Sequence, residues 1–228
     1  MSVKFFKAIQ AGDKNMVKRL LRKTPDLILA RDKGNLSPLM TAMYHHEFEI
    51  ADVILERMVA LTVYEAAATG KMAHLISNLA RKPELVNAYS DDGFQPLGLA
   101  AYFGQKEAVE YLIKAGAELN SVSKNKMAVT PLQSAVAGRH SEITRLLIET
   151  GASPNVRERG GYTPLHTAAH NGDIEITRIL IFGGADIEAS SEKGETPLDM
   201  ALAAGHSEVA ELLNSGITRR FRGSRFQK

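Results

Sequence analysis

A Thr-Pro-Leu sequence recurs along this chain at a nearly constant spacing, and this repetition constrains the fold more than any other feature does. Full copies begin at Thr130, Thr163 and Thr196, and a looser copy surrounds Pro96. The prolines of these four copies are separated by 35, 33 and 33 residues. A fixed period of about 33 residues predicts a stack of repeated structural units, and it favours a binding function over catalysis.

The unit that begins at Thr163 shows which local structure each part of the repeat predicts. Thr163 suits the N-cap of a helix, and Pro164 suits the first turn, where its missing N–H costs nothing. Gly172 suits a left-handed residue at the end of that helix. A second helix is predicted by the apolar spacing of Ile174, Ile176, Ile179 and Leu180. Lys193-Gly194 then predicts a turn at the tip of a finger.

This pattern resembles the ankyrin repeat. Four units carry the resemblance most clearly, and they begin at Gln95, Thr130, Thr163 and Thr196. The related sequences GAEL (116–119) and GADI (184–187) strengthen it. The resemblance implies an all-α solenoid with short β-hairpin fingers along one edge. It also implies that the chain binds a partner protein through its finger tips and the exposed residues of its inner helices.

The N-terminal half fits the same register less closely. Counting back from Gly12 and Gly70 places Lys4 and Thr62 at the position of the proline. Together with Pro38, these positions predict seven helix pairs. The interval of 24 residues from Pro38 to Thr62 has room for two helices but not for a finger. We therefore predict a fingerless junction near residues 56–62, where the stacking changes.

Two departures from the repeat occur around the fifth pair. Arg139 occupies the position where a glycine normally ends the inner helix, and Gly138 lies one residue earlier. The finger before Pro131 lacks its usual glycine and follows the longer interval of 35 residues. A longer or irregular finger is therefore expected there. It is either a binding element or simple drift of the sequence.

This register divides the chain into three parts. Residues 1–60 are expected to form two divergent repeats, residues 61–216 five repeats in the same solenoid, and residues 217–228 a basic tail. The segment from Val63 also resembles the start of many bacterial ankyrin proteins, which would make the first sixty residues an added pair. The terminal units are expected to have polar outer faces, and in the first unit these residues are Lys14, Lys18, Arg19, Arg22 and Lys23.

The composition excludes several classes of function. Apolar residues make up 44% and charged residues 24%, which is typical of a soluble chain with a core. The chain has no cysteine, which rules out disulfides, thiolate zinc sites and cysteine nucleophiles, and fits a cytoplasmic location. No apolar stretch approaches the length of a membrane span or a signal peptide.

Catalytic motifs are also missing from the sequence. The segment Thr69–Met72 resembles part of a phosphate loop, but Glu65 replaces the first glycine of that loop and Met72 the required hydroxyl residue. His46-Glu47 lacks the second histidine of a zinc-binding helix. We therefore expect a monomeric, non-enzymatic protein without cofactor or metal. The histidines His140, His166 and His206 are interpreted as structural.

The register selects candidates for the binding surface. On the inner helices these include Tyr44 and His45, and the finger candidates include Asp91 and Asp92. The eight residues selected as the main protein-binding surface are Phe94, Tyr102, Phe103, Met127, Val129, Tyr162, His170 and Asn171. Aromatic residues and methionine are enriched in interface cores, and the stack itself is not expected to bury these positions. The alternative is that the rings pack on neighbouring fingers as ordinary repeat residues.

The last twelve residues have a charge of their own. They contain Arg219, Arg220, Arg222, Arg225 and Lys228 and no acid, which leaves 23 basic against 26 acidic residues elsewhere. Arginines alternate there with Phe221 and Phe226, so the tail is a candidate for contact with nucleic acid or another acidic surface. The alternative is an ordinary mobile terminus.

Overall fold

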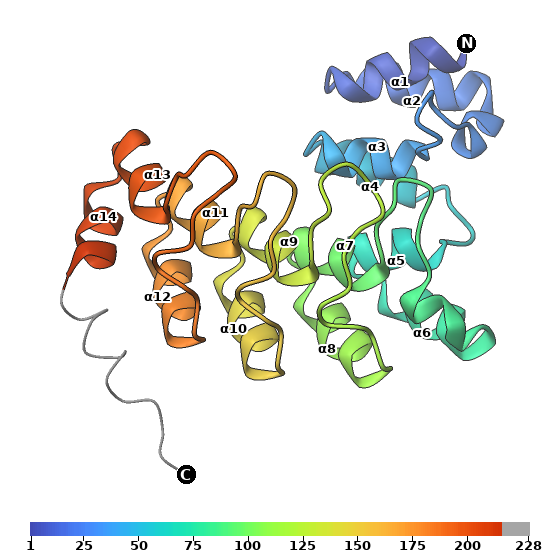
Figure 1. The fold of residues 1–228 in the computed structure, drawn as a ribbon. Helices are drawn as coiled ribbons and strands as arrows, with labels where there is room; N and C mark the ends of the chain where they lie inside the picture. The colour runs from blue at the N-terminus through green and yellow to red at the C-terminus, as the bar shows by residue number, and fades with distance from the viewer. Residues whose placement is uncertain (216–228) are drawn as a thin grey trace.

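The structure is a computed structural model, and it describes residues 1–215. These residues form fourteen α-helices in seven successive pairs (Figure 1), as the register predicted. The first helices of the pairs are α1 (Ser2–Gln10), α3 (Pro38–Tyr44), α5 (Val63–Thr69), α7 (Pro96–Tyr102), α9 (Pro131–Ala137), α11 (Pro164–His170) and α13 (Pro197–Ala203). The second helices are α2 (Lys14–Lys23), α4 (Phe48–Leu55), α6 (Met72–Arg81), α8 (Lys106–Lys114), α10 (Ser141–Glu149), α12 (Ile174–Phe182) and α14 (Ser207–Asn214). Short 3₁₀ helices follow α2 and α6, namely η1 (Pro25–Leu29) and η2 (Pro83–Asn87). The tail at 217–228 lies outside the described residues.

The helices from α5 onward form two rows. Figure 1 shows the inner helices α5, α7, α9, α11 and α13 in one row, and the outer helices α6, α8, α10, α12 and α14 in the other. One hydrophobic core runs along the stack from Phe5 to Leu213. Small residues such as Ala168 and Ala169 are fully buried on the inner helices, which lets neighbouring helices approach closely. Each unit therefore buries its apolar faces against its neighbours.

The repeated Thr-Pro pair begins helices as expected. Thr130 and Thr196 are N-caps with complete capping boxes, and each is followed by proline at the first helical position. The register is wrong at Thr62, because this residue is an N-cap and Val63 takes the proline position. The cause lies at the other end of α5, where Gly70 caps the helix directly and shortens the turn by one residue. Lys4 is likewise inside α1, which begins at Ser2.

The fingers are turns closed by backbone hydrogen bonds. Their closing bonds run from the N–H of Ser90 to the carbonyl of Phe94, from Glu158 to Tyr162, and from Ser191 to Glu195. The predicted β-hairpins are not formed as strands anywhere in residues 1–215. Adjacent fingers are joined by few backbone bonds, for example from Lys124 N–H to Gly93 O at 2.8 Å. Such isolated bonds do not build a strand ladder.

The finger before Pro131 is longer than the others, as the 35-residue interval predicted. Its closing bond runs from Ser123 N–H to the carbonyl of Val129, which encloses two more residues than the closing bonds of the other fingers. Ala128 adopts a left-handed conformation with φ 56° in this turn. No glycine is available there, so an L-residue takes the strained position.

The junction between α4 and α5 has no finger, as predicted. Residues 56–62 connect the two helices directly. Figure 1 shows α1 to α4 set at an angle to the two rows, with α3 near the finger side of the stack. The side-chain amide of Asn35, in the first finger, donates a hydrogen bond of 2.7 Å to Asp91 in the finger before α7. The missing finger therefore allows two fingers that are not neighbours in the repeat order to meet.

Candidate protein-binding surface

Three aromatic rings meet where α3 and α7 end. The ring centroid of Phe103 lies 5.5 Å from that of Tyr44 and 5.0 Å from that of Tyr102. The second pair is arranged edge to face, with an interplanar angle of 82°, which is a favourable geometry for aromatic rings. All three side chains are only partly buried. They form a cluster across two pairs of the stack, and it is called the aromatic cluster below.

The backbone of α7 holds Tyr102 and Phe103 in place. The carbonyl of Tyr102 contacts Nε2 of His140 at 2.9 Å, which ties the end of α7 to the next pair. Gly104 follows with φ 75°, and a Cβ there would lie 2.5 Å from the His140 ring. A side chain at position 104 would therefore displace the imidazole that fixes the cluster. The structural interpretation of His140 is confirmed.

A carboxylate fixes the other side of the cluster. The hydroxyl of Tyr44 donates a hydrogen bond of 2.5 Å to Oδ2 of Asp92, and the hydroxyl of Ser90 donates to the other carboxylate oxygen. Burial, and then the negative charge of Asp92, raise the pKa of Tyr44 well above its ordinary value. Burial is also the main cause that raises the pKa of Tyr64, whose hydroxyl donates to the carbonyl of Tyr89 at 2.8 Å. The phenols near this finger therefore remain neutral and act as donors.

Two of the predicted surface residues lie in the long finger, and their exposures differ. Met127 is 56% exposed at the tip. Val129 is only 8% exposed, so the expectation that the stack leaves this position unburied is wrong. The reason is that Val129 closes the long turn: its N–H donates to Oγ of Ser123 and its carbonyl accepts from the N–H of the same residue. This closure leaves the side chain buried.

Phe94 and Tyr162 are partly buried against the scaffold. Phe94 packs on a small core cluster of Met40, Ala68 and Leu99. The hydroxyl of Tyr162 donates to Oε2 of Glu195 at 2.8 Å, and its ring lies 5.6 Å from that of His166. Tyr162 therefore has packing and hydrogen bonding of its own on the next finger, in line with the alternative interpretation of this ring.

The histidine of the Thr-Pro-Leu-His sequence belongs to the scaffold. Nδ1 of His166 accepts a hydrogen bond of 3.0 Å from the N–H of Thr163, so Nε2 carries the proton and donates to the carbonyl of Glu195 at 3.0 Å. Burial is the main cause that lowers the pKa of His166. His206 contacts the carbonyl of His170 through Nε2 at 3.0 Å. The structural interpretation is therefore confirmed for both His166 and His206.

His170 and Asn171 lie at the end of α11, two pairs away from the aromatic cluster. The side chain of His170 is exposed and that of Asn171 is partly buried. They extend the candidate surface along the inner row but do not contact the rings of Tyr102 or Phe103. Among residues 1–215, no group of three or more histidines and acids is arranged to hold a metal ion.

Residues 63–158 match a model of the ankyrin-repeat family described as "Ankyrin repeats (3 copies)". Residues 147–201 match a second model, described as "Ankyrin repeats (many copies)". This is an ankyrin-repeat protein. The two matches together include the whole array from α5 to most of α13, which contains the Phe103 and Tyr102 side of the aromatic cluster.

Several curated proteins are similar to this chain over part of its length. The chain is 28% identical over 158 residues to the ankyrin repeat domain-containing protein SAT10 of Stachybotrys chartarum, which covers 68% of this chain and 8% of that protein. It is 30% identical over 176 residues to the target of rapamycin complex 2 subunit AVO2 of Saccharomyces cerevisiae, which covers 71% of this chain and 41% of that protein. It is 32% identical over 75 residues to the human DNA-binding protein RFXANK, which covers 33% of this chain and 29% of that protein. The chain thus spans less than half the length of each of these relatives.

Sequence reasoning missed part of the ankyrin surface around the finger before α7. The ammonium of Lys124 lies 4.1 Å from the centroid of the Tyr89 ring, a cation–π contact between two fingers. The hydroxyl of Tyr89 also contacts Oγ of Ser121 at 2.8 Å. The only sequence signal was a tyrosine one period before a lysine-rich finger.

None of the helices in residues 1–215 combines the length and apolar character that crossing a membrane requires.

Proposed function

We propose that this protein is a non-enzymatic scaffold or adaptor that binds a partner protein on the concave surface formed by its inner helices and fingers. Ankyrin repeats are generally protein–protein interaction modules, and the family assignment supplies this general expectation. The observation that carries the proposal is the aromatic cluster. Three contacting rings that remain partly exposed at the ends of inner helices offer the amphipathic surface from which binding hot spots are commonly built.

Further residues extend this surface toward the C-terminal end of the stack. Met127 exposes 56% of its side chain at the tip of the long finger, and methionine adapts readily to a partner's shape. His170 and Asn171 continue the surface at the end of α11. We assign Val129 no direct contact because it is buried. Phe94 and Tyr162 are assigned to the edges of the contact, where their exposed parts lie.

The experiment compares how tightly two variants, each with one aromatic residue replaced by alanine, bind the partner. Partners are first captured with the intact chain and identified, and their dissociation constants are then measured. Tyr102→Ala is expected to weaken binding by roughly tenfold or more, since truncation of a hot-spot residue costs at least about 2 kcal/mol. The matched control is Phe48→Ala on α4, because Phe48 is also an accessible aromatic, 53% exposed, but lies on an outer helix.

The comparison separates loss of contact from loss of fold. Both variants should show the helical circular dichroism and the thermal transition of the parent protein. Equal affinity of the parent and the Tyr102→Ala variant, with the fold intact, would exclude the aromatic cluster as the contact surface.

A second candidate function concerns the basic tail. Five basic residues and two phenylalanines within residues 217–228 favour contact with nucleic acid by charge and base stacking. Deletion of residues 217–228 is the test. If retention on a single-stranded DNA column at low salt is unchanged by the deletion, this function is excluded.

A further inference from the structure

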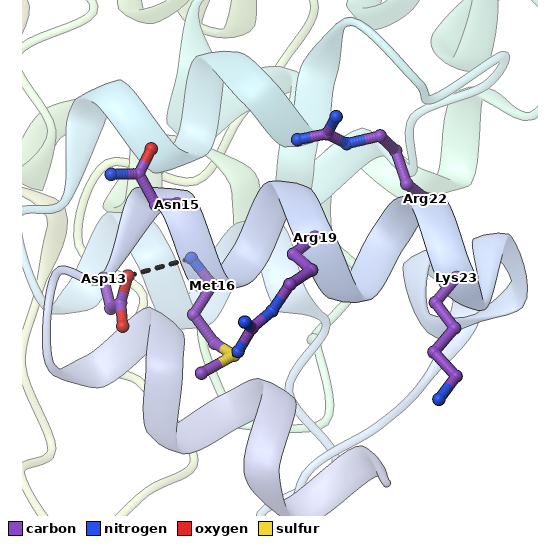
Figure 2. Close-up of a pocket in the computed structure, with 6 residues that line it drawn as sticks. All are labelled: Asp13, Asn15, Met16, Arg19, Arg22 and Lys23. Atoms are coloured by element: carbon purple, nitrogen blue, oxygen red, sulfur yellow. Dashed lines mark hydrogen bonds between the residues drawn. The ribbon is translucent and has the colours of Figure 1, made fainter.

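The outer surface of α2 contains an open depression at the N-terminal end of the stack. It has a volume of about 670 Å³ and is lined by Asp13, Asn15, Met16, Arg19, Arg22 and Lys23. Figure 2 shows Met16 and Arg19 lying together along one edge of the helix and Arg22 extending from the opposite edge. Asp13 caps the start of α2 by accepting a hydrogen bond of 2.8 Å from the N–H of Met16. The surface formed by Met16, Arg19, Arg22 and Lys23 is called the basic end face below.

The repeat register identifies this depression as a stacking surface. Aligning Gly12-Asp13 with Gly172-Asp173 places Met16 and Arg19 at the positions of Ile176 and Ile179 on α12. Both isoleucines are buried. Lys23 takes the position of Gly183, where an added Cβ would lie 2.7 Å from Ile148 of the preceding pair. In the sixth pair, this face of the outer helix therefore packs against α10 of the preceding unit.

The basic residues of this face form no ion pair in the part of the chain that the structure describes. On other outer helices, exposed cations pair with the next unit, as Lys106 does with Glu142 at 2.8 Å and Arg145 with Glu175 at 3.4 Å. Within residues 1–215, no carboxylate forms an ion pair with Arg19, Arg22 or Lys23. Arg19 contacts the Met16 sulfur at 2.9 Å, and Arg22 donates to a backbone carbonyl.

The spacing of these cations along α2 is unfavourable for the isolated helix. Arg19 is three residues before Arg22 and four before Lys23, so the like charges are neighbours on one surface and repel each other. Cations in the last turn favour the helix dipole, which accounts for Arg22 and Lys23. Arg19 lies a turn earlier, where the dipole offers little, and it occupies a position that is apolar in α12.

The need for a polar end unit does not explain the sign of the charge. Residues 1–35 contain nine basic and three acidic residues, whereas residues 36–215 contain fourteen basic and 23 acidic residues. The opposite end of the array is capped by acids, among them Asp199, Glu208 and Glu211, which are all exposed. A polar surface of either sign terminates a stack. The basic end face therefore has a charge that differs both from the rest of the array and from its other end.

We propose that the basic end face binds an acidic amphipathic helix of a partner protein. The shape supports a helix, because the equivalent face of α12 packs against the outer helix α10 of the preceding unit. The unpaired cations at spacings of three and four residues match carboxylates at the same spacing on a facing helix. Met16 supplies an apolar contact, and Asp13 at one end of the depression disfavours a uniform polyanion such as nucleic acid. This surface is separate from the aromatic cluster.

The probe is a fluorescein-labelled helical peptide of about 16 residues, roughly 24 Å long, with glutamates on one face and a leucine beside them. Binding to the full chain is followed by fluorescence anisotropy at low and high salt. The Arg19→Glu/Arg22→Glu/Lys23→Glu variant is expected to bind at least roughly tenfold more weakly, and high salt should weaken binding to the parent protein. A peptide with lysine in place of glutamate should not bind.

The chain offers a matched control for the loss of positive charge. Arg81 and Lys82 at the end of α6 are exposed cations at positions that correspond to Lys23 and Thr24 in the first unit. Arg81→Glu/Lys82→Glu should leave peptide binding unchanged within about twofold, because surface charges beyond the Debye length are screened. The neutral variant Arg19→Gln/Arg22→Gln/Lys23→Gln removes the positive charges without adding negative ones, so it keeps the test valid where charge reversal disturbs folding. It should also fail to bind the peptide.

Three results would overturn this proposal. One is peptide binding that survives both the charge-reversal and the glutamine variants. Another is tighter, Arg19-dependent binding of oligo-dT or of vesicles containing phosphatidylserine than of the peptide, which would assign the face to a nucleic acid or a membrane. The third is a dimer that light scattering detects in the parent protein but not in the variants, which would assign it to a second copy of the chain.

Discussion

The hydroxyl of Tyr44 on α3 donates a 2.5 Å hydrogen bond to Asp92, which lies 48 residues further along the chain in the finger before α7. This bond, with the one between Asn35 and Asp91, connects the first two helix pairs to the finger side of the array. It spans the site where the α4–α5 junction leaves out a finger. The contact therefore ties α3 to the finger before α7, where the Tyr44 ring also packs against Phe103.

Tyr44→Phe tests this connection. The substitution removes one donor from the Asp92 carboxylate but keeps the ring, so we expect a loss of about 1–2 kcal/mol in the free energy of unfolding. Urea denaturation measures the loss, and hydrogen exchange should show it mainly in α1 to α4. Tyr111→Phe on α8 is the control, because that hydroxyl forms no hydrogen bond within the described residues. An equal effect of both substitutions would show that the Tyr44 bond adds nothing specific.

The same hydroxyl predicts a change of stability in alkaline solution. Burial and the Asp92 charge raise the pKa of Tyr44, whereas in the unfolded chain a tyrosine ionises near pH 10. Above about pH 10 the unfolded chain releases a proton that the folded protein retains, so the contribution is complete below that pH and is lost as pH rises. The free energy of unfolding, measured in urea, should fall less steeply between neutral pH and about pH 11 for Tyr44→Phe than for the parent protein. Parallel declines in the parent and the variant would contradict this assignment.

His166 predicts the opposite dependence in acid. Burial lowers the pKa of His166 in the folded protein, so below about pH 6.5 the unfolded chain binds a proton that the folded protein excludes. The contribution is therefore complete above about pH 6.5 and is lost as pH falls below it. Glutamine is a suitable replacement, because Gln133 has the equivalent position in the preceding repeat. There its side chain accepts from the N–H of Thr130 at 2.8 Å and donates to the carbonyl of Val156. His166→Gln should keep the scaffold and remove this acid sensitivity; a variant that remains equally sensitive would rule His166 out as its source.

Arg139 is a position where the protein can be made more stable. Its φ is 62°, in the left-handed region that Gly172 occupies at the equivalent turn with φ 69°. Arg139→Gly should raise the free energy of unfolding by about 0.5–1 kcal/mol through relief of this strain. The lost ion pair with Asp173 contributes little, because the Arg139 side chain is 60% exposed. Arg139→Ala loses the same ion pair but keeps the strain, so thermal unfolding should show a gain only for glycine.

The period of the prolines and glycines was enough to predict the fold. It predicts seven helix pairs because most pairs have a left-handed glycine in the turn between their two helices and a proline at the start of the first helix. The register was wrong at Thr62 because α5 is capped directly by Gly70, whereas in α11 Asn171 lies between the helix and Gly172. Counting back a fixed number of residues from the glycine therefore places the start of α5 one residue too early. The β-hairpins followed from the family resemblance, and here the fingers form closed turns with too few bonds between them for strands.

The candidate surface was harder to predict than the fold. The register placed Tyr102 and Phe103 at the end of an inner helix, but the contact of Phe103 with Tyr44 depends on the tilt of α1 to α4. That tilt follows from a missing finger whose geometry the sequence does not specify. Val129 was expected to be exposed, and it is buried because its burial depends on how the long finger closes. The basic residues of α2 were recognised as an end cap, but only the structure shows that Arg19, Arg22 and Lys23 form no ion pair within residues 1–215, whereas Lys14 pairs with Glu49.

The most direct test of the central claim places a photo-crosslinking amino acid at single positions of the full chain. Tyr102 and Met127 are the test positions on the proposed contact surface, and Phe48 and Ile76, which are accessible on α4 and α6, are the controls. With a captured partner present, irradiation should crosslink that partner from Tyr102 and Met127 and not from Phe48 or Ile76. Crosslinks from the outer helices alone would contradict the account, because the partner would then bind the face opposite to the aromatic cluster.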